Sequence, residues 1–159
     1  MLVFAGAGLS AKKTVTVVET PASDSRIEYT GRIMVEGDEV SYDWSGVYFR
    51  IRFTGPSLAM KCSDSKNTWF NLWVDKEMTP VADKKFLVAA KDTVVVLAEG
   101  LGKGEHEVIL QKRTEAEQGR FTIHSFLTEG QALQAAGRKD RHIEFIGDPY
   151  TCGYGTESA

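Results

Sequence analysis

Apolar and polar residues alternate one for one in short runs along most of this chain. The clearest run places apolar side chains at every second position from Val47 to Phe53, with tyrosine and arginine between them. A period of two puts each set on its own face of an extended strand. Comparable runs follow at 58–62, 69–75, 93–98, 106–112, 121–126 and 143–146. The pattern therefore predicts a chain built from strands.

Residues that favour turns separate these runs. Gly55-Pro56 ends the first, and the glycine-rich segment 100–104 closes the run at 93–98. No stretch shows the spacing of an amphipathic helix. Many short strands without helices favour an all-β fold, an antiparallel β-sandwich of the jelly-roll or immunoglobulin-like kind.

The length of 159 residues allows one domain with a full core. We expect the sandwich to occupy residues 26–140. Residues 1–25 are interpreted as an apolar N-terminal segment followed by a polar linker, which can hold a short strand at 14–18. The run MLVFAGAGLSA resembles the back half of a secretory signal without its basic front half. It suggests a secreted or periplasmic protein.

Charge and composition exclude several classes of partner. The net charge of −3 argues against a nucleic-acid-binding surface. No apolar stretch approaches the roughly 20 residues that span a bilayer, so no membrane is expected. The only cysteines, Cys62 and Cys152, are interpreted as two free thiols. No His, Cys or carboxylate spacing fits a known metal site, and no cofactor is expected.

The segment FIGDPYTCGYG at 145–155 differs from the rest of the chain. An apolar strand there runs into a Gly-Asp turn, which is the opening of a β–α unit and has no place in a sandwich. We therefore expect residues 141–159 to be the first strand and loop of a further domain that is missing from this chain.

Several segments in the same order resemble family two of the carbohydrate esterases, the acetylxylan esterase group. The matching segments are YTGR at 29–32, DWSGV at 43–47, FTG at 53–55, LAEGL at 97–101, GEH at 104–106, KRTE at 112–115, IEFIGD at 143–148 and TCGYG at 151–155. The resemblance implies an N-terminal jelly-roll domain, followed by a hydrolase domain of the SGNH or GDSL type. It also implies an acetylated plant polysaccharide as substrate.

In that family, the position of Pro149 holds the serine nucleophile, within a motif that Gly147 and Asp148 begin. Proline has neither a hydroxyl to attack an ester nor a backbone N–H to donate to an oxyanion hole. The family's histidine base would lie beyond the last residue, whereas His106, His124 and His142 all precede the motif. The chain is therefore predicted to lack the family's esterase activity, with no catalytic residue intact.

Three residues are candidates for carbohydrate binding. Trp69 and Trp73 share one face of a strand, roughly 13 Å apart, with Asn71 between them. Such rings could stack on successive sugars while the amide binds hydroxyl groups. The alternative is that the rings fill the core or pack against the missing hydrolase domain, which is the more common use of large aromatic side chains in a sandwich.

Other conspicuous residues have structural interpretations. We interpret Trp44 as a core or interface residue, His106 as a turn residue, and the segment 112–115 as a domain contact or salt-bridged turn. Two hypotheses remain for the whole chain: the N-terminal domain of an acetylxylan-type esterase, and a stand-alone carbohydrate-binding module without esterase activity. A degenerate scaffold that binds nothing is a third option.

Overall fold

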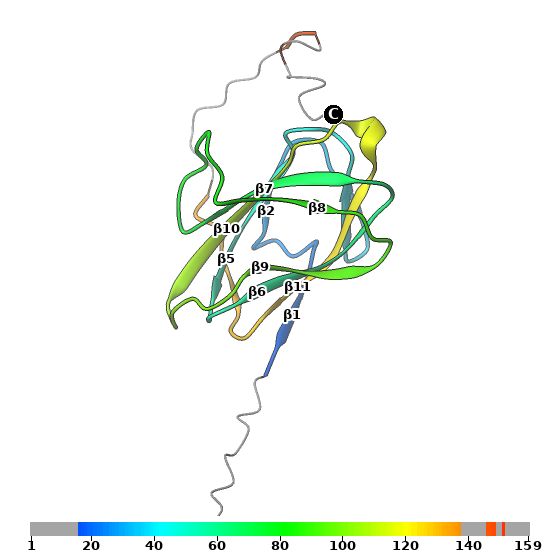
Figure 1. Cartoon of the computed structure of the whole chain (residues 1–159). Coiled ribbons are helices and arrows are strands. Elements are labelled where there is room, and N and C mark those ends of the chain that lie inside the picture. The colour runs from blue at the N-terminus through cyan, green and yellow to red at the C-terminus, as the bar shows by residue number, and fades with distance from the viewer. Residues whose placement is uncertain (1–15, 138–145, 149–150, 152–159) are drawn as a thin grey trace, which may run out of the picture.

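The computed structural model describes residues 16–137, 146–148 and 151. In this part of the chain two antiparallel sheets face each other, which confirms the predicted all-β sandwich. Figure 1 shows the two layers. The predicted signal segment at 1–11, the strand at 143–146 apart from Ile146, Pro149 and Cys152 lie outside the described residues.

We call the first layer sheet A. Its strands lie in the order β3-β4-β11-β6-β9, with β1 also paired to β11. Their bounds are β1 (Val18–Pro21), β3 (Met34–Glu36), β4 (Glu39–Tyr42), β6 (Leu58–Asp64), β9 (Thr93–Ala98) and β11 (Phe121–Thr128).

The second layer, sheet B, has the order β12-β5-β10-β7-β8, with β2 also paired to β5. Its strands are β2 (Glu28–Thr30), β5 (Tyr48–Thr54), β7 (Thr68–Val74), β8 (Lys84–Val88), β10 (Glu105–Lys112) and β12 (Ala132–Leu133). One short 3₁₀ helix, Ala116–Gln118, precedes β11. No helix among the described residues is long and apolar enough to cross a membrane.

The alternating pattern determines which residues form the core. In β5, Phe49, Ile51 and Phe53 are buried, while the residues between them are partly exposed. The pairs Val108–Ile51 and Leu110–Phe49 align the same pattern on β10. The apolar sides of both sheets therefore meet between the layers, where burial removes their area from water.

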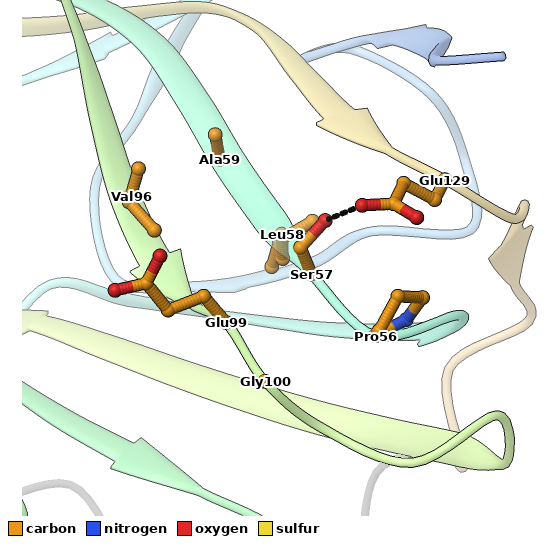
Figure 2. Close-up of a pocket in the computed structure, with 8 residues that line it drawn as sticks. All are labelled: Pro56, Ser57, Leu58, Ala59, Val96, Glu99, Gly100 and Glu129. Atoms are coloured by element: carbon orange, nitrogen blue, oxygen red, sulfur yellow. Dashed lines mark hydrogen bonds between the residues drawn. The ribbon is translucent and has the colours of Figure 1, made fainter. Parts of the chain in front are cut away.

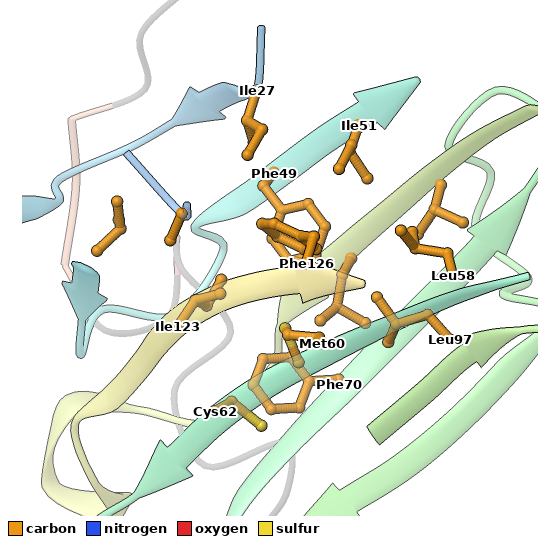
Figure 3. Packing of buried hydrophobic residues seen from close by; sticks show 14 of the residues in the cluster. Ile27, Phe49, Ile51, Leu58, Met60, Cys62, Phe70, Leu97, Ile123 and Phe126 are labelled. Carbon is orange, nitrogen blue, oxygen red and sulfur yellow. The ribbon is translucent and has the colours of Figure 1, made fainter. Parts of the chain in front are cut away.

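Aromatic rings form the centre of this core. Phe49 and Phe126 join the two sheets with ring centroids 5.0 Å apart, and Phe70 and Phe121 do so at 4.6 Å. Their tilted and edge-to-face geometries are the favoured ones. Figure 3 shows Phe49, Phe70 and Phe126 with Met60 and Cys62 in the same cluster. Cys62 is fully buried, and its pKa is raised to about 12 because burial disfavours the thiolate.

The sandwich begins before residue 26, where the sequence suggests its boundary. Val18–Pro21 pairs with β11 from Val18–Thr128 to Pro21–Ser125. Ala22 then lies fully buried in the core. A four-residue strand that buries only Thr20 fully has too few apolar positions to reveal its period.

Candidate functional site

The outer side of sheet B carries the predicted carbohydrate-binding residues. Phe70 and Leu72 of β7 point into the core, so Trp69, Asn71 and Trp73 point outward. The neighbouring strands place Leu87 of β8 opposite Trp69 and Gln111 of β10 opposite Asn71. We call the surface formed by Trp69, Asn71, Leu87, Gln111 and Arg113 the Trp69 face.

Hydrogen bonds fix the polar part of the Trp69 face. Asn71 donates from Nδ2 to Oε1 of Gln111 at 3.3 Å, and its Oδ1 accepts from Nη1 of Arg113 at 2.8 Å. The backbone N–H of Arg113 donates to the carbonyl of Trp69 at 2.9 Å. The two side-chain contacts hold the Asn71 amide in one orientation and use one of its two N–H donors.

The two tryptophans of β7 differ in exposure. The Trp69 residue is 38% exposed and Leu87 is 43% exposed, whereas Trp73 is only 2% exposed. The indole N–H of Trp73 donates to the carbonyl of Val81 at 3.3 Å, so the segment after β7 covers this ring. Trp73 therefore offers no open ring face, and of these two tryptophans only Trp69 can stack on a sugar. Carbohydrate binding by this group stays a prediction.

Sequence reasoning missed Leu87 and Gln111 as members of this surface. Gln111 alternates with the inward-facing residues of β10, so the sequence pattern could have placed it on the outer side of the sheet. Leu87 lies on β8, whose lysine-rich run KKFLV does not alternate. The sequence suggests that Arg113 belongs to a charged turn, but it lies beside Asn71 because β10 and β7 are neighbours.

The motif at 147–151 is described only in part. Asp148 accepts hydrogen bonds from the backbone N–H of Thr151, at 3.0 Å to its carbonyl and 3.2 Å to its Oδ1. A Cβ on Gly147 would meet Thr151 Oγ1 at 2.2 Å, which explains the need for glycine in this turn. Ile146 is exposed. Pro149 lies outside the described residues.

The segment 112–115, expected to be a charged surface turn, begins with a buried lysine. Lys112 is fully buried, and its ammonium donates to the carbonyl of Thr114 at 2.6 Å and of Glu115 at 3.1 Å. Burial lowers the pKa of Lys112 to about 8, although nearby carboxylates oppose this. Lys112 thus ties the end of β10 to the following turn.

A groove of about 400 Å³ lies at one end of the sandwich, where turns of both sheets meet. Figure 2 shows Glu99 and Glu129 on either side of Ser57 and Leu58. Ser57 donates to Oε1 of Glu129 at 3.1 Å. This groove offers carboxylate acceptors beside the apolar side chains of Leu58 and Val96. Among the described residues, no cluster of His, Cys, Asp or Glu could hold a metal ion.

Comparisons with known proteins define the class of this domain. A family model described as carbohydrate esterase 2 N-terminal matches residues 29–136. A solved family two carbohydrate esterase from Cellvibrio japonicus shares the fold, with a TM-score of 0.75 at 24% identity over 87% of this chain and 41% of that one. The domain is thus a β-sandwich of the kind found in carbohydrate esterases.

More similar relatives give the family. The chain is 38% identical over 134 residues to an acetylxylan esterase / glucomannan deacetylase of Cellvibrio japonicus, and 34% identical over 142 residues to the cellulase/esterase CelE of Acetivibrio thermocellus. These matches cover 80% and 87% of this chain, but the chain spans only 35% and 17% of those relatives.

A solved family two esterase from Clostridium thermocellum, in complex with cellohexaose, is also similar. It is 34% identical, with a TM-score of 0.72 over 82% of this chain and 40% of that one. The chain belongs to the N-terminal domain family of the family two carbohydrate esterases.

Proposed function

We propose that this domain is a carbohydrate-binding part of an esterase that acts on acetylated plant polysaccharide, and that it lacks the family's own nucleophile. The observation that carries this proposal is the Trp69 face, where an exposed indole lies beside an amide oriented by two partners. An aromatic ring beside fixed polar groups is the usual chemistry for binding a sugar. The relatives named for acetylxylan and glucomannan, and the one crystallised with cellohexaose, support this class of ligand.

The second part of this proposal concerns catalysis at the family motif. Pro149 supplies neither the hydroxyl nor the N–H that the family's nucleophile would give. We therefore expect no acyl-enzyme at residues 145–155.

The test is a calorimetric titration of the 159-residue chain with cellohexaose and xylohexaose. We expect binding that Trp69→Ala abolishes, and that Val94→Ala leaves intact. Val94 is the matched control because it is exposed on the outer side of sheet A. Binding that is equal in wild type and Trp69→Ala would overturn the assignment of the site.

A second candidate is that the Trp69 face packs against a hydrolase domain. Leu87 favours it, since this exposed apolar side chain lies opposite Trp69 and adds apolar area that sugars do not need. Mixing the chain with the separately produced hydrolase domain of the Cellvibrio relative would distinguish the two. Association lost in Leu87→Ser, together with no sugar binding by the free chain, would favour this candidate.

A further inference from the structure

Three adjacent strands of sheet A bring a serine, a histidine and a glutamate together. Ser63 of β6 lies with Oγ 3.0 Å from Nε2 of His124 on β11. The other ring nitrogen, Nδ1, lies 2.7 Å from Oε1 of Glu39 on β4. His124 and Glu39 are partly exposed, with 31% and 50% of their side chains accessible.

In the neutral form of His124, the chemistry of these groups fixes the direction of the hydrogen bonds. An ionised Glu39 can only accept, so Nδ1 of His124 carries the proton and donates it. Nε2 is then the acceptor, and the Ser63 hydroxyl donates to it. This is the order of contacts in a serine–histidine–acid triad, in which the histidine takes the serine proton and the acid holds the ring.

A β-bulge places His124 in this position. Along β11, Ile123 pairs with Cys62 and Ser125 pairs with Lys61, so His124 is the extra residue between two successive partners on β6. Such bulges redirect a side chain and are frequent beside active sites.

A groove of about 220 Å³ lies along β3 and β4 of the same sheet. It is lined by Arg32, Met34, Ser41, Asp43, Trp44 and Arg120. Thr122 connects groove and triad, because it pairs with Ser41 on one side and with Ser63 on the other. Trp44 is 51% exposed, and the Arg32 guanidinium carbon lies 5.0 Å from its ring centre. The groove thus offers an aromatic ring and hydrogen-bond donors for the alcohol part of an ester.

We propose that Ser63 is a nucleophile that accepts an acyl group from an ester, with His124 as its base and Glu39 as the residue that orients His124. The substrate class is a small acyl ester of a hydroxylated alcohol such as a sugar. This site is separate from residues 145–155 and from the Trp69 face.

The proposed step moves one acyl group and one proton. Ser63 Oγ forms a bond to the carbonyl carbon while its proton passes to Nε2 of His124. The bond from that carbon to the alcohol oxygen then breaks, and the alcohol leaves with the proton from Nε2. Water then attacks the acyl-serine ester, gives its proton to His124 Nε2, and releases the acid and the free Ser63 hydroxyl. Thr122 pairs with Ser63, so its side chain lies on the same side of the sheet and can supply a hydroxyl donor for the oxyanion. Each donor of an oxyanion hole contributes about 100-fold or more to the rate. Because Thr122 is a single donor, the acyl transfer should be slow.

A fluorophosphonate probe tests this proposal, since its serine adduct resists water. The Ser63 oxygen would bond to phosphorus, fluoride would leave, and the serine proton would pass to His124. We expect peptide mapping of the labelled 159-residue chain to find the adduct on Ser63. His124→Gln should slow labelling on the order of 100-fold, the usual contribution of a general base. Glu39→Gln should slow it less.

Ser125→Ala is the matched control. Ser125 lies on the same strand, but its hydroxyl donates to Glu19 at 2.6 Å and not to a histidine. Labelling of Ser63 should persist in this variant. An unlabelled wild-type chain, or equal labelling in His124→Gln, would overturn the proposal without affecting sugar binding by the Trp69 face. An adduct within residues 145–155 would instead contradict the proposed function.

Discussion

Nδ1 of His106, on β10, lies 2.7 Å from Oδ2 of Asp75, the residue that follows β7. Nε2 of the same ring lies 3.1 Å from the carbonyl oxygen of Gly102. Both partners can only accept, so both ring nitrogens donate only when the imidazole is protonated. The hydrogen bond to Asp75 is the main reason that the pKa of His106 is raised above 6.5. His106, expected to be a turn residue, thus anchors the glycine-rich turn to sheet B.

This contact predicts a dependence of stability on pH. Since the folded pKa is raised, the stabilisation is complete below pH 6.5 and is lost as pH rises through the folded value. Asp75 has a positive φ of 53°, which asparagine tolerates, so Asp75→Asn removes the charge without backbone strain. The test is urea denaturation at pH 6 and pH 9. At pH 6 the free energy of unfolding of wild type should exceed that of the variant, by less than about 1 kcal/mol. At pH 9 the two should be equal. An equal gap at both values would contradict this role.

Burial of Lys112 should make the free energy of unfolding rise with pH, opposite to the effect of His106 and at higher pH. Its pKa falls from 10.5 to about 8 because the folded protein buries the ammonium. Between those values the unfolded chain binds more protons, so the stability of the folded state rises with pH. Relative to Lys112→Met, wild type should gain between about 1 and 2 kcal/mol in free energy of unfolding between pH 8 and 9.5. A difference that stays constant across this range would show that Lys112 remains charged in the fold.

Gly130 predicts a packing defect. A Cβ at this position would lie 2.1 Å from the carbonyl oxygen of Thr54, where the turn after β11 crosses the end of β5. Gly130→Ala must therefore displace backbone, and we expect it to lower the free energy of unfolding by about 2 kcal/mol or more. Gly104 is the control, because a Cβ there would meet nothing within 4 Å. Equal thermal stabilities of Gly130→Ala and Gly104→Ala would contradict such a close approach of the turn to Thr54.

Arg113 predicts an indirect effect on carbohydrate binding. Its guanidinium holds Asn71 at 2.8 Å, so Arg113→Met frees the amide to rotate without removing Asn71 itself. We expect cellohexaose to bind roughly fivefold more weakly, which is about 1 kcal/mol for one oriented hydrogen bond. The circular dichroism spectrum should stay that of the wild type. Unchanged affinity in this variant would show that the orientation of Asn71 is not part of the site.

The sequence predicts most of the fold where buried and partly exposed positions alternate strictly, as in β5 and β6. It does not reveal β2, β3 and β8, since β3 is exposed at all three positions and the other two bury at most one residue. The alternation and the charge of a residue can also give opposite predictions. Lys112 lies on the same side of β10 as Val108 and Leu110, which predicts burial, but its charge suggests a surface residue.

The candidate site also depends on contacts that the local sequence pattern does not reveal. Alternation places Trp69 and Trp73 on one side of β7, but coverage of Trp73 by the segment around Val81 is a tertiary contact that no local pattern encodes. Ser63, His124 and Glu39 come from three separate runs, and their contact depends on strand order and on one bulge.

Carbohydrate binding by the Trp69 face can be followed through the indole N–H signals in nitrogen–proton correlation spectra during titration with cellohexaose. Trp44→Phe, Trp69→Phe and Trp73→Phe would assign the signals of the three tryptophans. We expect the Trp69 signal to shift progressively to saturation. The Trp73 signal should stay in place, because its indole N–H donates to the carbonyl of Val81. A Trp69 signal that does not move at millimolar cellohexaose or xylohexaose would contradict carbohydrate binding by the Trp69 face.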